Sequence, residues 1–280
     1  MRKAGLAVGL AFGVFNLQTA SVEPQPAGDA EARTIIQRAL ERAVWNKEQD
    51  WVAQYRSHMT REVRRFDGNG NITEEDRGDF SVVPVEGVPF ERRLTVNGRP
   101  MSDEERGWED DREAEFRADI RKTRAMAREV ENDVNEIAFN GDLIGRYTLT
   151  LVGEDRLRRR PTYRIAFEPR SNDLPVRHRI DHALNKANGH IWIDRETHEA
   201  ARVEFELTER VRLWWGVLGS IIRARGSLDR TPVLPLLDDN VWARVQFETY
   251  TDTRTIFKRT RRAEFRRWRE FDWVEDRRSH

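Results

Sequence analysis

The sequence predicts a mainly β protein whose antiparallel sheet must curl on itself. Segments that alternate apolar and charged residues recur along the chain, most regularly at residues 201–207 and 241–250. Such alternation is typical of strands with one buried face. Short polar turns connect most of these segments without intervening helices, which indicates an antiparallel meander. We expect about nine to eleven strands, too many for a flat sheet, so the sheet curls into a barrel or half-barrel.

Composition excludes several classes of protein. The 49 basic and 49 acidic residues cancel, so no global field attracts nucleic acid. The absence of Cys excludes disulfides, thiolate metal sites and Cys nucleophiles. Although 35% of the residues are charged, nine Trp and 13 Phe provide bulk for a core, so the chain is expected to fold. Its 280 residues suffice for one large domain or two small ones.

The N-terminus has the pattern of a secretory signal peptide. Arg2 and Lys3 form a short basic region, and residues 4–17 are apolar and uncharged. The glycines of this stretch disfavour a buried helix, and a membrane anchor needs roughly 20 apolar residues. We therefore predict a signal peptide over residues 1–21.

The predicted cleavage of the signal peptide sets the expected domain boundaries. Small side chains predict cleavage after Ser21, with cleavage after Ala20 as the alternative. Residues 22–28 then form a flexible leader, and residues 29–280 form a single domain. No later segment is long and apolar enough to span a membrane. We expect the mature protein in the periplasm of a bacterial cell envelope.

A helix and a hairpin open the mature domain. Asp29 can cap a helix over residues 30–46, and its apolar residues recur at helical spacing: Ile35, Ile36, Leu40 and Val44. Residues 51–66 and 72–83 are extended. The turn sequence Asp-Gly-Asn-Gly-Asn at residues 67–71 joins them into a predicted hairpin.

Residues 102–137 form a highly charged helical insertion. Ser102 and Glu105 form a capping box at its start. Acidic and basic residues recur at helical spacing, whereas apolar residues are sparse. Gly107 could divide this segment into two helices. We expect the insertion to pack over one edge of the sheet and, with the N-terminal helix, to act as a lid.

The second half of the chain returns to strands. The predicted strands cover residues 147–152, 161–167, 189–194, 201–207, 241–250, 253–259 and 263–273, with a short helix near residues 176–186. Arg alternates with Phe257, Phe265 and Trp268 in the last part, and we expect the arginines to face outward and the aromatic rings inward. Nucleic-acid binding is the alternative there, which interleaved acidic residues and export disfavour.

No residue pattern predicts catalysis. The sequence has no Gly-rich phosphate loop, nucleophile elbow or helical His-Glu-x-x-His, so we expect neither an enzyme nor a cofactor. His178 and His182 have a spacing that two metal ligands can use, but the flanking arginines repel a cation. The turn at residues 67–71 resembles a calcium loop only superficially, because Ile72 and Gly78 replace the required Gly and Glu.

One apolar run breaks the alternation. Residues 213–222 include Trp214, Trp215 and two glycines and are nearly all apolar. Such a run can form a mobile loop at a barrel mouth that contacts acyl chains or a membrane surface. It can also be a strand end or a short helix buried in the core.

The order of these segments resembles the LolA-like superfamily, the periplasmic outer-membrane lipoprotein-sorting proteins and their relatives. The points of likeness are the signal followed by a helix, the hairpin turn, and the segments 147–151, 163–167, 189–194 and 203–205. The resemblance implies an unclosed β-barrel covered by helices, an apolar interior that receives acyl chains, and no catalytic residues. The charged insertion and the run at 213–222 depart from the compact carriers.

Two functions follow as hypotheses. The first is a non-catalytic periplasmic carrier that buries the acyl chains of a lipid or lipoprotein. Its predicted cavity and mouth residues are Trp192, Phe205, Trp214, Trp215, Leu218, Ile222, Val245 and Phe247. The second is an envelope sensor or interaction module of the same fold whose charged helices bind a protein partner. An exported hydrolase is the weakest alternative, and nothing indicates more than a monomer.

Overall fold

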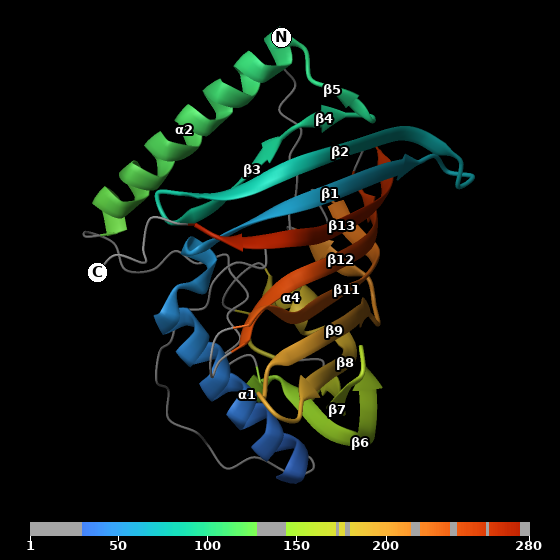
Figure 1. The fold of residues 1–280 in the computed structure, drawn as a ribbon. Coiled ribbons are helices and arrows are strands. Elements are labelled where there is room, and N and C mark those ends of the chain that lie inside the picture. The colour runs from blue at the N-terminus through green and yellow to red at the C-terminus, as the bar shows by residue number, and fades with distance from the viewer. Residues whose placement is uncertain are drawn as a thin grey trace.

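The structure of the protein, a computed structural model, describes residues 30–127, 144–171, 174–176, 180–213, 219–235, 240–255 and 258–274. One antiparallel sheet dominates it, flanked by helices (Figure 1). The predicted signal peptide and leader lie outside the described residues, as do residues 128–137 of the charged insertion. In the part of the chain that is described, no helix combines the length and apolar character needed to cross a membrane.

The sheet has 11 strands in the order β3-β2-β1-β13-β12-β11-β9-β8-β7-β6, and β10 also pairs with β11. The strands are β1 (Tyr55–Phe66), β2 (Ile72–Val85), β3 (Val88–Arg93), β6 (Tyr147–Leu157), β7 (Arg160–Pro169), β8 (Ala187–Asp194), β9 (Ala200–Leu207), β10 (Val211–Leu213), β11 (Gly219–Pro235), β12 (Asn240–Arg254) and β13 (Arg259–Trp273). The end strands β3 and β6 do not pair with each other, so the sheet stays unclosed. The predicted fold class is therefore confirmed.

Three short elements complete the described fold. A 3₁₀ turn, η1 (Trp51–Ala53), follows the first helix, and α4 (Asp181–Leu184) precedes β8. The two-stranded ribbon of β4 (Thr95–Val96) and β5 (Arg99–Pro100) follows β3. The expected helix near residues 176–186 is thus one turn long.

Several strand assignments from the sequence need correction. Strand β3 was not predicted, because Pro84, Gly87 and Pro89 interrupt the residue pattern around it. The strand predicted at residues 253–259 is wrong, because β12 runs to Arg254 and a turn precedes β13. In this turn the backbone N–H of Thr255 donates to the carbonyl of Lys258 at 2.8 Å. Strand β11 was not predicted, since register shifts and Pro232 interrupt its alternation.

The first helix, α1 (Ala30–Gln49), forms the core with one half of the sheet. Ile35 and Ile36 are buried, as the predicted apolar stripe requires. They pack against buried side chains of β6, β7 and β8, which are Tyr147, Leu149, Ile165, Ile191 and Ile193. The sheet half from β6 to β9 is therefore the half that α1 covers (Figure 1).

The charged helix α2 (Asp103–Ala127) begins with the predicted capping box. The backbone N–H of Ser102 donates to the Glu105 carboxylate at 2.8 Å, and the backbone N–H of Glu105 donates to the Ser102 hydroxyl at 3.2 Å. The helix continues through Gly107, so the suggested division there is wrong. An exposed glycine costs a helix only about 1 kcal/mol, which the rest of α2 tolerates.

Helix α2 covers the edge of the sheet along β3 (Figure 1). The carboxylate of Glu109 accepts a hydrogen bond from the backbone N–H of Arg93 at 3.0 Å, and the Arg112 guanidinium donates to the backbone carbonyl of Glu91. The rings of Phe90 and Phe116 are 5.1 Å apart. Because an unpaired edge strand invites pairing with other chains, the charges of α2 protect this edge.

The capping box predicts an acid-sensitive helix start. Hydrogen bonds from the Arg99 guanidinium, followed by the backbone N–H of Ser102, lower the pKa of Glu105 from 4.5 to about 2. A carboxylate with a lowered folded-state pKa contributes its full stabilisation above pH 4.5, and this is lost as the pH falls toward about 2.

NMR titration of the Glu105 carboxyl carbon should therefore give a midpoint far below 4.5, and Arg99→Gln should move it upward. A wild-type midpoint near 4.5 would contradict this assignment.

Candidate functional site

The two faces of the sheet carry different side chains. Residues directly opposite each other in an antiparallel pair project to the same face. One continuous row of such partners is Ile165, Ile191, Val203, Leu228, Phe247, Arg266 and Arg61, which crosses from β7 to β1. Ile165 and Ile191 pack against α1. We call this side the α1 face and the other side the groove face.

The α1 face continues as an apolar surface beyond the part that α1 buries. Val203, Phe205, Leu228 and Phe247 are only half-buried, and they form what we call the apolar strip. Gly226 makes room for this strip, because a Cβ atom there would lie 2.9 Å from the Phe205 ring. The strip is therefore an accessible extension of the core onto β9, β11 and β12.

Beyond the apolar strip, the α1 face carries arginines. Phe247 lies opposite Arg266, which lies opposite Arg61. Arg230 lies opposite Arg244 between β11 and β12. We call these four residues the arginine row. Arg61, Arg230 and Arg266 have side chains about one quarter exposed, at 25%, 25% and 26%, and Arg244 is exposed.

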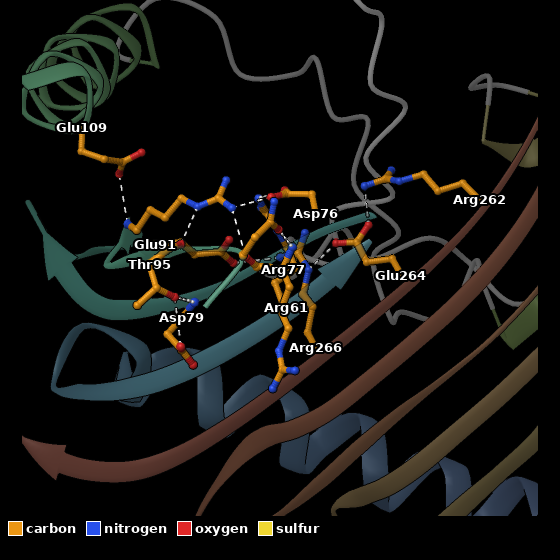
Figure 2. Close-up of polar contacts among 12 residues, drawn as sticks. Arg61, Asp76, Arg77, Asp79, Glu91, Thr95, Glu109, Arg262, Glu264 and Arg266 are labelled. Carbon is orange, nitrogen blue, oxygen red and sulfur yellow. Dashed lines mark hydrogen bonds and ion pairs between the residues drawn. The ribbon is translucent and has the colours of Figure 1, made fainter. Parts of the chain in front are cut away.

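Carboxylates near the arginine row are shared between guanidinium groups (Figure 2). Asp76 pairs with Arg61 at 3.6 Å and also with Arg93. Glu264 pairs with Arg266 at 2.6 Å and with Arg262 at 2.7 Å. Glu91 pairs with Arg266 at 2.9 Å. Since two of these carboxylates each serve two arginines, positive charge predominates in these contacts.

Burial and like charge both act on the arginine row. Burial lowers the pKa of Arg61, and the positive charge of Arg266 lowers it further. The protein therefore holds these guanidinium groups close together in a region where charge is costly.

Glu199 connects α1 to the sheet at the boundary between the apolar and basic parts. Its side chain is only 2% exposed. It accepts hydrogen bonds from Arg42 at 3.0 Å and Asn46 at 2.5 Å, both on α1, and from Arg230 of β11 at 2.8 Å. This buried carboxylate fixes the second half of α1 over the β8–β9 turn.

The groove face carries a polar groove of about 940 Å³. It follows a row of register partners across seven neighbouring strands, from Ala166 on β7 to Glu62 on β1. Small side chains lie at its β7 end, at Ala166, and near its middle, at Ser227. Charged and aromatic side chains line it, among them Arg64, Arg202, Glu204, Glu206, Arg225, Glu248, Tyr250 and Phe265.

The structure brings two of the predicted cavity residues together on the α1 face, namely Phe205 and Phe247. It places Trp192 on the groove face, where the indole N–H donates to Asp155 at 3.0 Å and two guanidinium groups flank the ring. Val245 and Ile222 lie at register shifts of β12 and β11. Trp214, Trp215 and Leu218 lie outside the described residues.

Sequence reasoning missed Leu228 and the arginine row. The expectation that the arginines of the last strand face outward and its aromatic rings inward is wrong in part. Arg266 shares the α1 face with Trp268, and Phe265 shares the groove face with Arg267. The register of β13 against β1 and β12 decides this orientation. Of the suggested histidine pair, His178 lies outside the described residues, and the described residues contain no group of three metal-ligating side chains.

Comparisons with known proteins find likeness in fold. No family model matches the chain, and no curated protein matches it. A Vibrio parahaemolyticus domain described as an outer membrane lipoprotein-sorting protein is similar at 8% identity, with 87% of this chain and 95% of that chain covered and a TM-score of 0.32.

Two further solved structures are similar. A LolA superfamily protein from Nitrosomonas europaea has 9% identity, 87% and 94% coverage and a TM-score of 0.27. The MucA/MucB complex of Pseudomonas aeruginosa gives 14% identity, 86% and 94% coverage and a TM-score of 0.26. The LolA superfamily, which the order of segments resembles, is thus among the proteins with similar solved structures.

The Glu199 contacts predict a large loss of stability on truncation. Glu199→Ala would leave Arg42 and Arg230 without their shared carboxylate, and we expect a loss of roughly 2–3 kcal/mol, since both arginines keep some solvent contact. Urea denaturation measures the difference in free energy of unfolding between the variant and the wild type, provided that both have the same m value.

The matched control is Glu209→Ala, which removes a 58% exposed carboxylate that pairs with Lys186. It should cost less than about 0.5 kcal/mol. Equal losses for the two variants would show that Glu199 does not hold α1.

Proposed function

We propose that the protein is a non-catalytic periplasmic carrier that holds the acyl chain of a lipid or lipoprotein on the α1 face of the sheet. The apolar strip beside α1 is the observation that carries this proposal. Half-buried Val203, Phe205, Leu228 and Phe247 extend the core without being fully covered by it. An acyl chain lying along the strip would exclude water from these side chains.

The strip suits reversible binding rather than permanent burial. Covering about 300 Å² of apolar surface contributes about 7.5 kcal/mol at 25 cal/mol per Å². This corresponds to a low-micromolar dissociation constant before the costs of association are subtracted. A carrier needs this range of affinity, since it must also release its ligand.

The export predicted from the sequence supports a role in the envelope. The signal peptide predicted over residues 1–21 would deliver the chain to the periplasm, where acyl chains need a protein to cross water. The excess of charged side chains on α2 keeps that helix hydrated while it covers the edge of the sheet.

Substitutions on the two faces test the carrier proposal. Phe247→Asp places a carboxylate in the strip, and we expect it to weaken uptake of a fluorescent fatty acid at least tenfold, because a buried Phe contributes about 1.5–3 kcal/mol. Titration of the probe fluorescence measures the affinity, and circular dichroism verifies the fold.

Phe265→Asp is the matched control, since Phe265 of β13 lies on the groove face, on the other side of the sheet from Phe247. It should bind the probe as the wild type does. Equal loss in both variants, or no uptake by the wild type, would refute the carrier proposal.

The groove favours a second function, the binding of an extended polypeptide. Seven strands spaced about 4.8 Å apart give the groove a length of roughly 29 Å, enough for about eight or nine extended residues. Its lining carries both Arg225 and Glu248 together with Tyr250. A polypeptide can pair with such charges, whereas an acyl chain would desolvate them without compensation.

This surface differs from the partner site expected from the sequence, which was the charged helices. On α2, Glu109, Arg112 and Phe116 contact β3, so part of the helix's polar surface is already bound. The groove crosses seven strands of the sheet, and a partner segment that lies along it would contact all seven.

A library of nine-residue peptides tests the second function. Peptides that bind the wild type in fluorescence polarisation should lose at least tenfold in affinity with Arg225→Glu, because the reversal changes the charge of the groove. Phe247→Asp, on the other face, should leave their affinity unchanged. Absence of any binding peptide, or loss with Phe247→Asp instead, would contradict this function.

A further inference from the structure

Within the arginine row, like charges oppose each other at two register positions. Arg61 of β1 lies opposite Arg266 of β13, and Arg230 of β11 lies opposite Arg244 of β12. Directly opposed like charges destabilise an antiparallel pair. Four neighbouring strands thus present the arginine row on one face, although the opposed guanidinium groups repel each other.

The nearby carboxylates do not match the arginines one for one. Asp76 and Glu264 are each shared by two arginines, whereas Glu91 gives Arg266 a second carboxylate. Arg230 likewise shares Glu199 with Arg42 of α1. The arginine row therefore retains capacity for a further anion, and the exposed side chain of Arg244 can be reached from solvent.

The arginine row adjoins the apolar strip. Arg266 is the direct register partner of Phe247, so the last ring of the strip and the first guanidinium of the row are neighbours on the same face. Arg230 follows Leu228 on the same face of β11. An apolar surface that ends in a basic one matches a molecule with an apolar chain and an anionic end.

We propose that the arginine row binds the anionic headgroup of an amphiphile whose acyl chain lies on the apolar strip. The headgroup is a carboxylate or a phosphate, and the planar fork of a guanidinium group can bind two oxygens of either one. This inference rests on the carrier function proposed above and adds to it the chemical class of the ligand.

Three ligands that share a 14-carbon chain separate the headgroup from the chain. Myristate and myristoyl-lysophosphatidylglycerol are anionic, and myristyl alcohol is neutral. Isothermal titration calorimetry of the full mature protein should give at least tenfold tighter binding of the two anionic ligands. This advantage should shrink between about 50 and 500 mM salt, because salt screens charges at the solvent-accessible row.

The double variant Arg61→Gln/Arg266→Gln should lose the anionic advantage and still bind myristyl alcohol. Arg61→Lys/Arg266→Lys should recover part of it, since the charge returns without the guanidinium fork. Arg267→Gln is the matched control, because Arg267 lies on the groove face beside Arg266. It should keep the full advantage, and circular dichroism verifies the fold of each variant.

Three other outcomes would each contradict either the headgroup site or the carrier function. If the wild type binds the alcohol as tightly as the two anions, the headgroup site is wrong and the carrier function stands. If inorganic phosphate alone binds as tightly as the lysophospholipid, the row binds free anions and not an amphiphile. If no chain-bearing ligand binds, both the carrier function and the headgroup site are wrong.

Discussion

The buried carboxylate of Glu199 is the contact on which the organisation of the α1 face depends. It joins two residues of α1 to Arg230 of β11, and so fixes how far the helix extends over the sheet. The first half of α1 buries the aliphatic residues of β6 to β8. Because the helix is held there, the apolar strip and the arginine row beyond it stay accessible.

Local signals made much of the fold predictable. The capping box at Ser102 and Glu105, the turn at residues 67–71 and the apolar stripe of α1 each depend on neighbours in the sequence, and each is present in the structure. Strand β11 carries no such signal, because Pro232 and the extra residues Ile222 and Val233 interrupt its alternation. Without β11, neither Leu228 nor Arg230 could be assigned to a face.

The candidate site was predictable only in part, for a related reason. Phe205 lies in a regularly alternating strand, so its face could be inferred, whereas the register shift at Val245 interrupts the alternation of β12 just before Phe247. The side chains of Ile191, Trp192 and Ile193 are all buried, so hydrophobicity does not tell which face Trp192 occupies. Likewise, the orientation of Arg266 and Phe265 follows from pairing with strands far away in the sequence, which alternation within β13 cannot reveal.

The central claim is that an acyl chain lies on the α1 face, and photo-crosslinking tests it most directly. Myristate with a diazirine near the end of its chain would be irradiated with the mature protein and the labelled peptides mapped by mass spectrometry. The account predicts labels on the apolar strip, at Phe205, Leu228 or Phe247. Labels on Tyr250 and Phe265 of the groove face, or labels scattered over the surface, would contradict it.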